Sequence, residues 1–163
     1  AGFVLKEIIK NKLTKKKIKV IDLGPKTNMS VDYPDYAKKV ARNVSSKKTN
    51  MGILVCGSGT GMAMSANKFR KIRAAVCYNS VSTRLSRTHN NANILALGSR
   101  LTNKREALKL VNIFLLLLIL ILMRILEIFF LLQLLIQILS LILLFLMDSI
   151  LALISNMVTP QLR

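Results

Sequence analysis

An apolar run covers residues 113 to 147, contains neither Gly nor Pro, and limits the possible folds of this chain more than any other segment. Only five of its residues are not apolar, namely Arg124, Glu127, Gln133, Gln137 and Ser140. Residues 128 to 147 carry no charge, and a helix of that length spans about 30 Å, the thickness of a bilayer's hydrocarbon core. The run predicts a long apolar helical tail. This tail is either a transmembrane helix or a low-complexity segment such as a frameshift product.

The charged residues lie almost entirely before this run, which divides the chain in two. Residues 1 to 112 hold 23 of the 25 Lys and Arg and five of the seven acidic residues, and the net charge is +18. The lysines are scattered, and no aromatic residues alternate with them as in single-strand binding sites. We therefore predict a solvated basic surface and no nucleic-acid partner. The predicted domains are residues 1–112 and the tail, residues 113–163.

The cysteines indicate neither a metal site nor a disulfide scaffold. Cys56 and Cys77 are 21 residues apart and the chain has one histidine, a spacing that fits no zinc site. No secretory signal opens the chain, because Ala1 and Gly2 lead directly into an amphipathic segment. A reducing compartment is then the default, and we expect a cytoplasmic protein, with membrane association if the apolar tail is genuine.

Residues 1 to 112 alternate between helical and strand character. Helical spacing of apolar residues occurs over 2–14, 34–44, 61–68 and 80–88 and from 103 onward, and short apolar strand-like runs occur over 18–23, 51–56, 74–77 and 94–97. This alternation predicts an α/β fold, a Rossmann-like three-layer sandwich with a parallel sheet. Because such folds usually begin with a strand and this chain begins in a helix, we expect the first strand to be missing.

A glycine-rich turn follows the predicted strand at 51–56 and reads Cys56-Gly57-Ser58-Gly59-Thr60-Gly61. Backbone N–H groups of such a turn at a helix N-terminus form an anion-binding nest. No Lys-Ser or Lys-Thr pair follows the last glycine, which excludes a Walker loop. Cys56 ends the strand, where open α/β sheets place their sites, and the nearby N–H dipoles favour a thiolate. The alternative is a buried cysteine that only fills the core.

His89 is the only histidine and follows the predicted helix at 80–88. A histidine at this place could simply cap the C-terminus of the helix. Asn90, which follows it, could be an ordinary turn residue. These two residues alone do not distinguish a site from a helix end.

Six strings between residues 1 and 112 match one known family in order and with compatible spacing. They are Ala1–Lys6, Val31–Ala37, Gly52–Gly61, Ala66–Phe69, Ile72–Ala75 and Leu85–Arg100. Through them the chain resembles the ribose-5-phosphate isomerase B family and the wider group that includes the galactose-6-phosphate isomerase subunits. The resemblance implies interconversion of ribose 5-phosphate and ribulose 5-phosphate, a step of the pentose phosphate pathway. It also implies a homodimer that uses no metal or cofactor.

The same resemblance implies roles for particular residues in a cis-enediolate mechanism. Cys56 matches the base that moves a proton between C1 and C2. The turn residues match the groups that hold the enediolate charge, through the Ser58 hydroxyl and the amides of Gly57, Gly59, Thr60 and Gly61. His89 matches the acid–base residue that opens the furanose ring. Substrate contacts are implied for Tyr33, Asn90 and Arg100, in a site built from both subunits.

Two parts of the family pattern have no match in this chain. The family's first strand ends in Asp-His ahead of the residues matched by Ala1 and Gly2. Its C-terminal arginines, which bind the phosphate, have no counterpart after Val111. Charge-assisted phosphate contacts contribute about 1.5–3 kcal/mol each, so we expect weak or no isomerisation. The alternative functions are a galactose-6-phosphate isomerase subunit, or a non-catalytic protein that is membrane-tethered or the product of a degraded gene.

Overall fold

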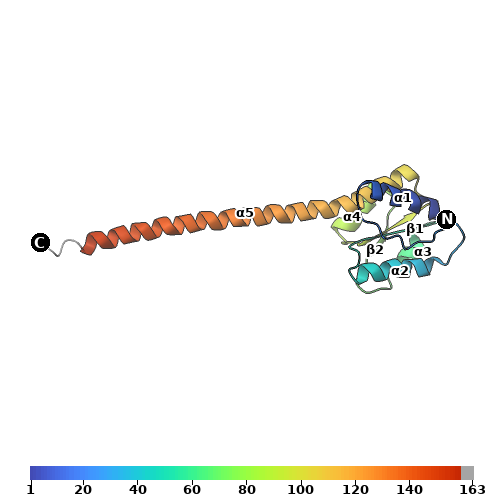
Figure 1. Ribbon diagram of the computed structural model, residues 1–163, viewed down its shortest axis with the longest axis horizontal. Coiled ribbons are helices and arrows are strands. Elements are labelled where there is room, and N and C mark those ends of the chain that lie inside the picture. The colour runs from blue at the N-terminus through green and yellow to red at the C-terminus, as the bar shows by residue number, and fades with distance from the viewer. Residues whose placement is uncertain (159–163) are drawn as a thin grey trace. The chain divides into compact units, whose positions relative to one another are not determined.

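The computed structural model describes residues 1–158, and for residues 117–124, 145–146 and 148–158 it describes the backbone alone. Helices and strands alternate along the chain (Figure 1). The elements are α1 (Phe3–Lys15), α2 (Tyr33–Ser45), β1 (Gly52–Cys56), α3 (Thr60–Ala66), β2 (Ala74–Val76), α4 (Ser80–Thr88), β3 (Ile94–Gly98) and α5 (Lys104–Val158). All but one of the helices and strands expected from the sequence are present, with ends that shift by a few residues.

The three strands form one parallel sheet in the order β1-β3-β2. Gly52 to Cys56 of β1 lie in register with Ile94 to Gly98 of β3, and β2 pairs with the first three residues of β3 from the other side. All five residues of β3 are buried, as expected of a central strand that helices cover on both faces. The carboxyl ends of β1 and β3 therefore meet at the same end of the sheet.

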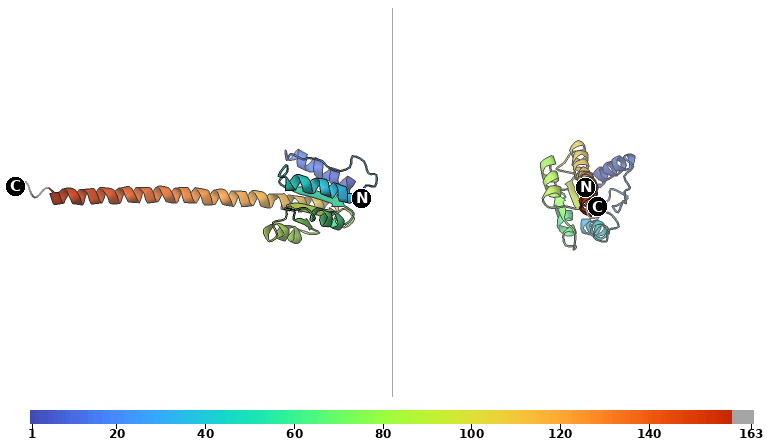
Figure 2. Two further views of the ribbon diagram at one scale, coloured as in Figure 1. Left: turned by 90° about the horizontal axis from the view of Figure 1, so that it is seen from below. Right: turned by 90° about the vertical axis from the view of Figure 1, so that its left-hand side faces the viewer.

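Helices cover both faces of this sheet (Figures 1 and 2), and two apolar clusters are buried between helices and sheet. One cluster joins Ile9 and Leu13 of α1 and Phe114 of α5 to Leu95 and Leu97 of β3. The opposite cluster joins the apolar residues of α2 and α3 to the alternate side chains of β3. Because successive residues of a strand point to opposite faces, one short apolar strand serves both clusters. This arrangement confirms the predicted three-layer α/β fold.

The expected strand over 18–23 is absent, and that prediction was wrong. The segment is irregular, and Ile18, Val20 and Ile21 are 41%, 36% and 46% exposed. Its β-branched residues favour a strand, but a strand also needs a neighbour with which to exchange backbone hydrogen bonds. Among the described residues, no backbone hydrogen bond joins residues 19–23 to another segment. The β-propensity of these residues alone therefore does not produce a strand, because no neighbouring strand pairs with them.

α5 belongs to two compact units, residues 1–118 and 119–163. In the first unit it buries Ala107, Leu110, Val111 and Phe114 against the sheet. In the part of the second unit that is described, Ile125–Leu144 is long and apolar enough to cross a membrane, and none of it is buried. The domain boundary expected between residues 112 and 113 remains a prediction. Core packing continues at least to Phe114, which is fully buried.

Candidate active site

The turn after β1 wraps around the sulfur of Cys56. The Gly59 N–H donates to the Cys56 Sγ at 3.1 Å, and the thiol is half-buried. Gly59 adopts a φ of +85°, a left-handed conformation that glycine reaches without steric cost. A backbone N–H aimed at sulfur stabilises negative charge there. The local sequence therefore places a thiol, at the carboxyl end of a buried strand, in contact with a donor.

The turn is held against the end of β3 by direct packing of backbone on backbone. A Cβ on Gly98 would lie 2.6 Å from the Ser58 carbonyl oxygen, and one on Gly59 would lie 3.0 Å from the Leu97 carbonyl carbon. The distance at Gly98 leaves no room for a side chain, and at Gly59 a tight contact adds to the strain that the positive φ imposes on any other residue. The two glycines thus let the turn and β3 approach closely, and this contact fixes where the thiol and the amides lie.

Arg100 lies beside this turn and supplies a positive charge. Its backbone N–H donates to the Gly57 carbonyl oxygen at 3.0 Å. Its guanidinium carbon lies 3.5 Å from the position that a Cβ of Gly57 would take. The side chain is exposed at the mouth of the turn. An exposed guanidinium next to backbone donors is suited to bind an anionic group.

Tyr33 and Ser58 complete the group of predicted residues at this carboxyl end of the sheet. The Tyr33 ring packs on Gly61, where a Cβ would lie within 2.8–3.0 Å of the ring edge and hydroxyl. The Ser58 hydroxyl accepts a long hydrogen bond of 3.4 Å from the Thr60 N–H, and both residues are exposed. The structure therefore places Tyr33, Arg100 and the whole turn from Cys56 to Gly61 around one surface.

His89 and Asn90 lie at the opposite end of the sheet, where the strands begin. α4 follows the carboxyl end of β2 and returns along the sheet, and His89 ends it with an N–H bonded to the Leu85 carbonyl. The chain then reaches the amino end of β3, where the Asn93 N–H donates to the Arg73 carbonyl. A five-residue strand is about 16 Å long. Within one chain these two residues therefore do not reach the Cys56 thiol.

Two residues of structural importance were not found by sequence reasoning, one beside the site and one at the amino end of β3. The Ser99 hydroxyl donates to the Cys56 carbonyl at 3.0 Å and to the Ala1 carbonyl at 2.9 Å, which ties the first residues to the end of β1. Arg87 is buried, its NH1 donates to the Ala92 carbonyl, and its guanidinium lies 5.3 Å from the Phe114 ring centre. Burial, and the charge of Arg73, lower the pKa of Arg87. The position of Ser99 between Gly98 and Arg100 could have indicated its role. No sequence signal indicates that Arg87 is buried.

The described residues hold no group of three or more His, Cys, Asp or Glu side chains that could bind a metal ion. The reactive groups that the structure places on this surface are a thiol, backbone amides and a guanidinium. A thiolate can accept a proton, and N–H donors can stabilise an oxyanion. The arrangement suits the removal of a proton next to a carbonyl group.

Residues 1–117 match the family model described as ribose/galactose isomerase. Ribose-5-phosphate isomerase B of Escherichia coli is 43% identical over 114 residues, which are 70% of this chain and 76% of that protein. The structure is similar to ribose-5-phosphate isomerase B of Clostridium thermocellum, with a TM-score of 0.69 and 49% identity over 69% of this chain and 76% of that one. It is also similar to the Mycoplasma genitalium enzyme with bound ribulose 5-phosphate, with a TM-score of 0.66 and 41% identity, covering 69% and 75%.

Proposed function

Because this chain belongs to the ribose/galactose isomerase family, we propose that it is an aldose–ketose isomerase that interconverts ribose 5-phosphate and ribulose 5-phosphate. The observation that carries this proposal is the turn around Cys56. It combines a half-buried thiol, a bonded N–H and an adjacent guanidinium at the carboxyl end of a strand. The relatives named for this activity support the choice of substrate.

In the proposed mechanism the Cys56 thiolate removes the C2 proton of the open-chain aldose. The electrons of the broken C–H bond form the C1–C2 double bond of a cis-enediolate, and the carbonyl oxygen becomes negatively charged. The amides of the turn and the Ser58 hydroxyl stabilise that charge as it develops. The proton returns to C1, while the hydroxyl proton of C2 moves to the oxygen of C1. Tyr33 and Arg100 bind the substrate beside the turn.

We propose that a complete site forms between two copies of the chain. His89 and Asn90 lie at the opposite end of the sheet from Cys56, so only a second subunit can bring them to the thiol. In a two-fold dimer, a residue of one subunit that contacts a second residue on its partner has that contact repeated with the two subunits exchanged. Two equivalent sites would then form, each with the thiol of one chain and the imidazole of the other, which opens the furanose ring.

Subunit complementation tests this arrangement directly. The variants Cys56→Ala and His89→Ala are each expected to be inactive in an assay of ribulose 5-phosphate formation. When equal amounts are unfolded together and refolded, about a quarter of the original sites regain both residues, because half of the dimers are mixed and each has one intact site. Recovery of about a quarter of the activity supports the shared site. Activity of the single His89→Ala variant, or no recovery on mixing, contradicts it.

The level of activity is itself a prediction. No arginine follows Arg100 and Arg105 in the first unit, so the C-terminal arginines that the family resemblance implies for phosphate binding have no counterpart there. Each such contact contributes about 1.5–3 kcal/mol, and the loss of two raises KM by roughly two to four powers of ten. We expect slow turnover that requires Cys56 and that saturates only at high substrate. Turnover unaffected by Cys56→Ala would overturn the proposal, and a low KM would overturn the expectation of weak binding.

Galactose 6-phosphate is the competing sugar, because the matching family description covers both sugars. Competition between the two sugar phosphates in the same assay separates them. Faster conversion of the six-carbon substrate would assign the chain to the galactose branch. We expect ribose 5-phosphate to be preferred, as in the named relatives.

We further propose that the first unit works in the cytoplasm and that α5 tethers it to a membrane. Both cysteines are free thiols, as in a reducing compartment. Ile125–Leu144 meets the length and polarity of a membrane span. Fractionation of cells that express the full chain tests this proposal. Recovery in the membrane pellet that resists carbonate and yields to detergent supports the tether, whereas a monodisperse protein in detergent-free buffer contradicts it.

A further inference from the structure

The amino end of the sheet carries an exposed cluster of basic residues. α1 starts beside the carboxyl end of β1, and α2 and α3 each lead back to the start of the next strand, so all three helices end at the amino end. The Ser45 hydroxyl donates to the Arg70 carbonyl at 2.9 Å, which joins the segments that follow α2 and α3. Each segment after these helices holds two adjacent exposed basic residues, and together they form the basic face: Lys16 and Lys17, Lys47 and Lys48, and Arg70 and Lys71.

The acidic residues of the first unit all lie away from the basic face. Asp32 and Asp35 lie at the start of α2, beside Tyr33, and Glu106 lies in the first turn of α5. These three residues are at the carboxyl end of the sheet. Glu7 is in the first half of α1, and the fifth acid, Asp22, is bonded to that half of the helix.

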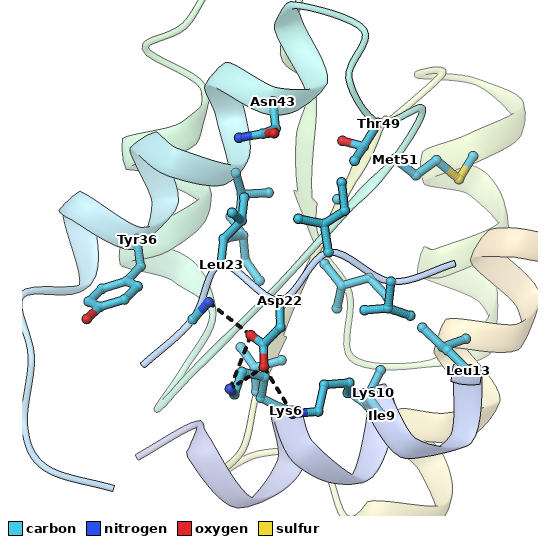
Figure 3. Close-up of a pocket in the computed structure, with 18 of the residues that line it drawn as sticks. Lys6, Ile9, Lys10, Leu13, Asp22, Leu23, Tyr36, Asn43, Thr49 and Met51 are labelled. Carbon is cyan, nitrogen blue, oxygen red and sulfur yellow. Dashed lines mark hydrogen bonds and ion pairs between the residues drawn. The ribbon is translucent and has the colours of Figure 1, made fainter. Parts of the chain in front are cut away.

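The acids on this side of the unit already have basic partners. Asp22 accepts from the Lys6 Nζ at 2.9 Å and from the Lys10 Nζ at 3.1 Å. Figure 3 shows these bonds beside the cavity that is lined by β1 and residues 18–25. Glu7 contacts the same two lysines. Lys6 and Lys10 are thus neutralised, whereas no residue of the basic face forms an ion pair within the described part of the chain.

Three lysines of the basic face have a backbone conformation that favours glycine. The φ angles of Lys17, Lys47 and Lys71 are +59°, +59° and +68°. Helices commonly end in a glycine with this conformation, because a side chain is strained there. A basic residue near a helix C-terminus interacts favourably with the helix dipole, but the adjacent basic residue of each pair already supplies that charge. The turns alone therefore do not account for lysine at these three positions.

α5 leaves the first unit at the same end of the sheet. It starts after the carboxyl end of β3 and runs back, and the Lys16 Nζ donates to the Asn112 Oδ1 at 2.9 Å. The first unit ends at residue 118, and the apolar span Ile125–Leu144 follows. The residues between them reach at most about 25 Å. A membrane that holds the span therefore lies within that distance of the end of the first unit.

We propose that the basic face docks the first unit on the anionic lipid headgroups of the membrane that α5 enters. This inference rests on the proposed membrane tether and does not rest on the shared catalytic site. Anionic lipids attract basic residues that lie within about a Debye length of the membrane surface. A basic face without acidic neighbours is complementary to such a surface. Docking at this end leaves the turn around Cys56, at the opposite end of the sheet, open to substrate.

Lysine labelling of the full chain in lipid vesicles tests the docking. The vesicles consist of phosphatidylcholine alone, or contain phosphatidylglycerol as about a third of the lipid. An amine-reactive acetyl ester is added briefly, and mass spectrometry gives the reaction rate of each lysine. We expect the lysines of the basic face to react at least about threefold more slowly in the anionic vesicles. Lys26 and Lys104, which are also exposed, should react equally in both. The protection should disappear in about 0.5 M salt, where the Debye length is below about 5 Å.

A triple variant, Lys17→Gly, Lys47→Gly and Lys71→Gly, removes charge from the basic face without removing core packing. Because glycine suits the left-handed backbone at these positions, we expect the temperature of thermal unfolding to stay the same or to rise. The remaining lysines of the face, Lys16 and Lys48, should then react in anionic vesicles at nearly the rate seen in neutral vesicles. Unchanged protection of these two lysines would contradict the docking.

A matched variant removes three charges outside the basic face, by Lys26→Gln, Lys38→Gln and Lys104→Gln. It should keep the protection of the face, and its loss would show that only the net charge matters. Equal labelling of the face in both kinds of vesicle, or equal protection of Lys26 and Lys104 in the original chain, would also overturn the proposal. Protection by single-stranded RNA in neutral vesicles would assign the face to nucleic acid instead.

Carbonate extraction of the same vesicles separates this inference from the proposed tether. A chain that resists extraction but shows no lipid-dependent labelling overturns the docking and leaves the tether standing. A chain that is extracted from both kinds of vesicle overturns the tether, and the docking with it. Neither measurement depends on isomerase activity, so both are independent of the proposed catalytic function.

Discussion

The two edges of β1 are opposite in character. Toward β3, its residues exchange hydrogen bonds along the whole strand, and the turn that follows is packed on β3 through Gly59 and Gly98. Away from β3, Ile53 and Val55 face a cavity. The same five residues thus support a fully bonded edge that carries the candidate site and an open edge that carries none of it. The site depends on β3 for its geometry.

Proline substitution at neighbouring positions should separate the two edges most strongly. Leu54→Pro removes an N–H that faces β3, and we expect a loss of about 3 kcal/mol or more in the free energy of unfolding. Ile53→Pro removes an N–H that faces the cavity, where an edge strand tolerates proline. Urea unfolding measures both, with Ile53→Ala as the control for lost side-chain packing. Similar losses for the two proline variants would show that the open edge is bonded in solution.

The glycine contact behind the turn should give the next largest effect. Gly98→Ala places a Cβ about 2.6 Å from the Ser58 carbonyl oxygen, and relief of that overlap is expected to cost about 1–3 kcal/mol. Gly57→Ala is the matched control, because its Cβ would lie 3.5 Å from the Arg100 side chain, an ordinary contact. We expect it to change stability by less than about 0.5 kcal/mol. Thermal unfolding of the two variants checks the difference.

The bonded edge could be predicted from the sequence because its signals are local. A five-residue apolar run such as Ile94–Gly98 indicates a buried strand by itself, and the glycine spacing from Gly57 to Gly61 indicates a tight turn. Matching strings then indicated which side chains act there. These features need no knowledge of how distant parts of the chain are arranged.

The open edge and the position of His89 could not be predicted in this way. Residues 18–23 have strand-like composition, but whether they form a strand depends on a neighbour that no local pattern describes. The place of His89 depends on how α4 packs on the sheet. Because α4 runs back from the carboxyl end of β2 toward the amino end of β3, its last residues lie away from Cys56. The sequence pattern alone assigns Cys56 and His89 to one site, but it does not show whether a single chain can bring them together.

Arg87 packs near the start of β3, and its replacement should change the free energy of unfolding less than the glycine substitution does. Its guanidinium is buried against Phe114 with one bond to the Ala92 carbonyl, and its Nε has no partner among the described residues. Replacing a poorly paired buried charge by an apolar residue of similar length is often neutral or stabilising. We therefore expect Arg87→Met to change the free energy of unfolding by less than about 1 kcal/mol. Arg87→Ala also removes the packing on Phe114 and should destabilise more. A large loss in Arg87→Met would mean that the charge has a partner in solution.

The smallest effect is expected at the far wall of the cavity, where Asp22 holds residues 18–25 to α1. Burial opposes ionisation of Asp22, but the hydrogen bonds from Lys6, Gly24 and Lys10 outweigh it, so its pKa is lowered on folding. A lowered pKa stabilises the fold above the unfolded-state value, about 3.9 for aspartate. That contribution is lost as the pH falls through the folded value. Asp22→Asn should cost less than about 1 kcal/mol at pH 7, because the pairs are partly exposed.

As the pH falls through the folded-state pKa of Asp22, the difference between Asp22→Asn and the original chain should shrink, since both then lack the charge. Urea unfolding over a series of acidic pH values measures it, with Asp35→Asn as a control, because Asp35 pairs with no lysine in the described part of the chain. Hydrogen exchange over residues 18–25 gives a second readout. If the ion pairs of Asp22 with Lys6 and Lys10 hold residues 18–25 to α1, Asp22→Asn should speed exchange in that segment while β1 and β3 are unchanged. A change spread over β3 would show that the two edges of β1 are coupled.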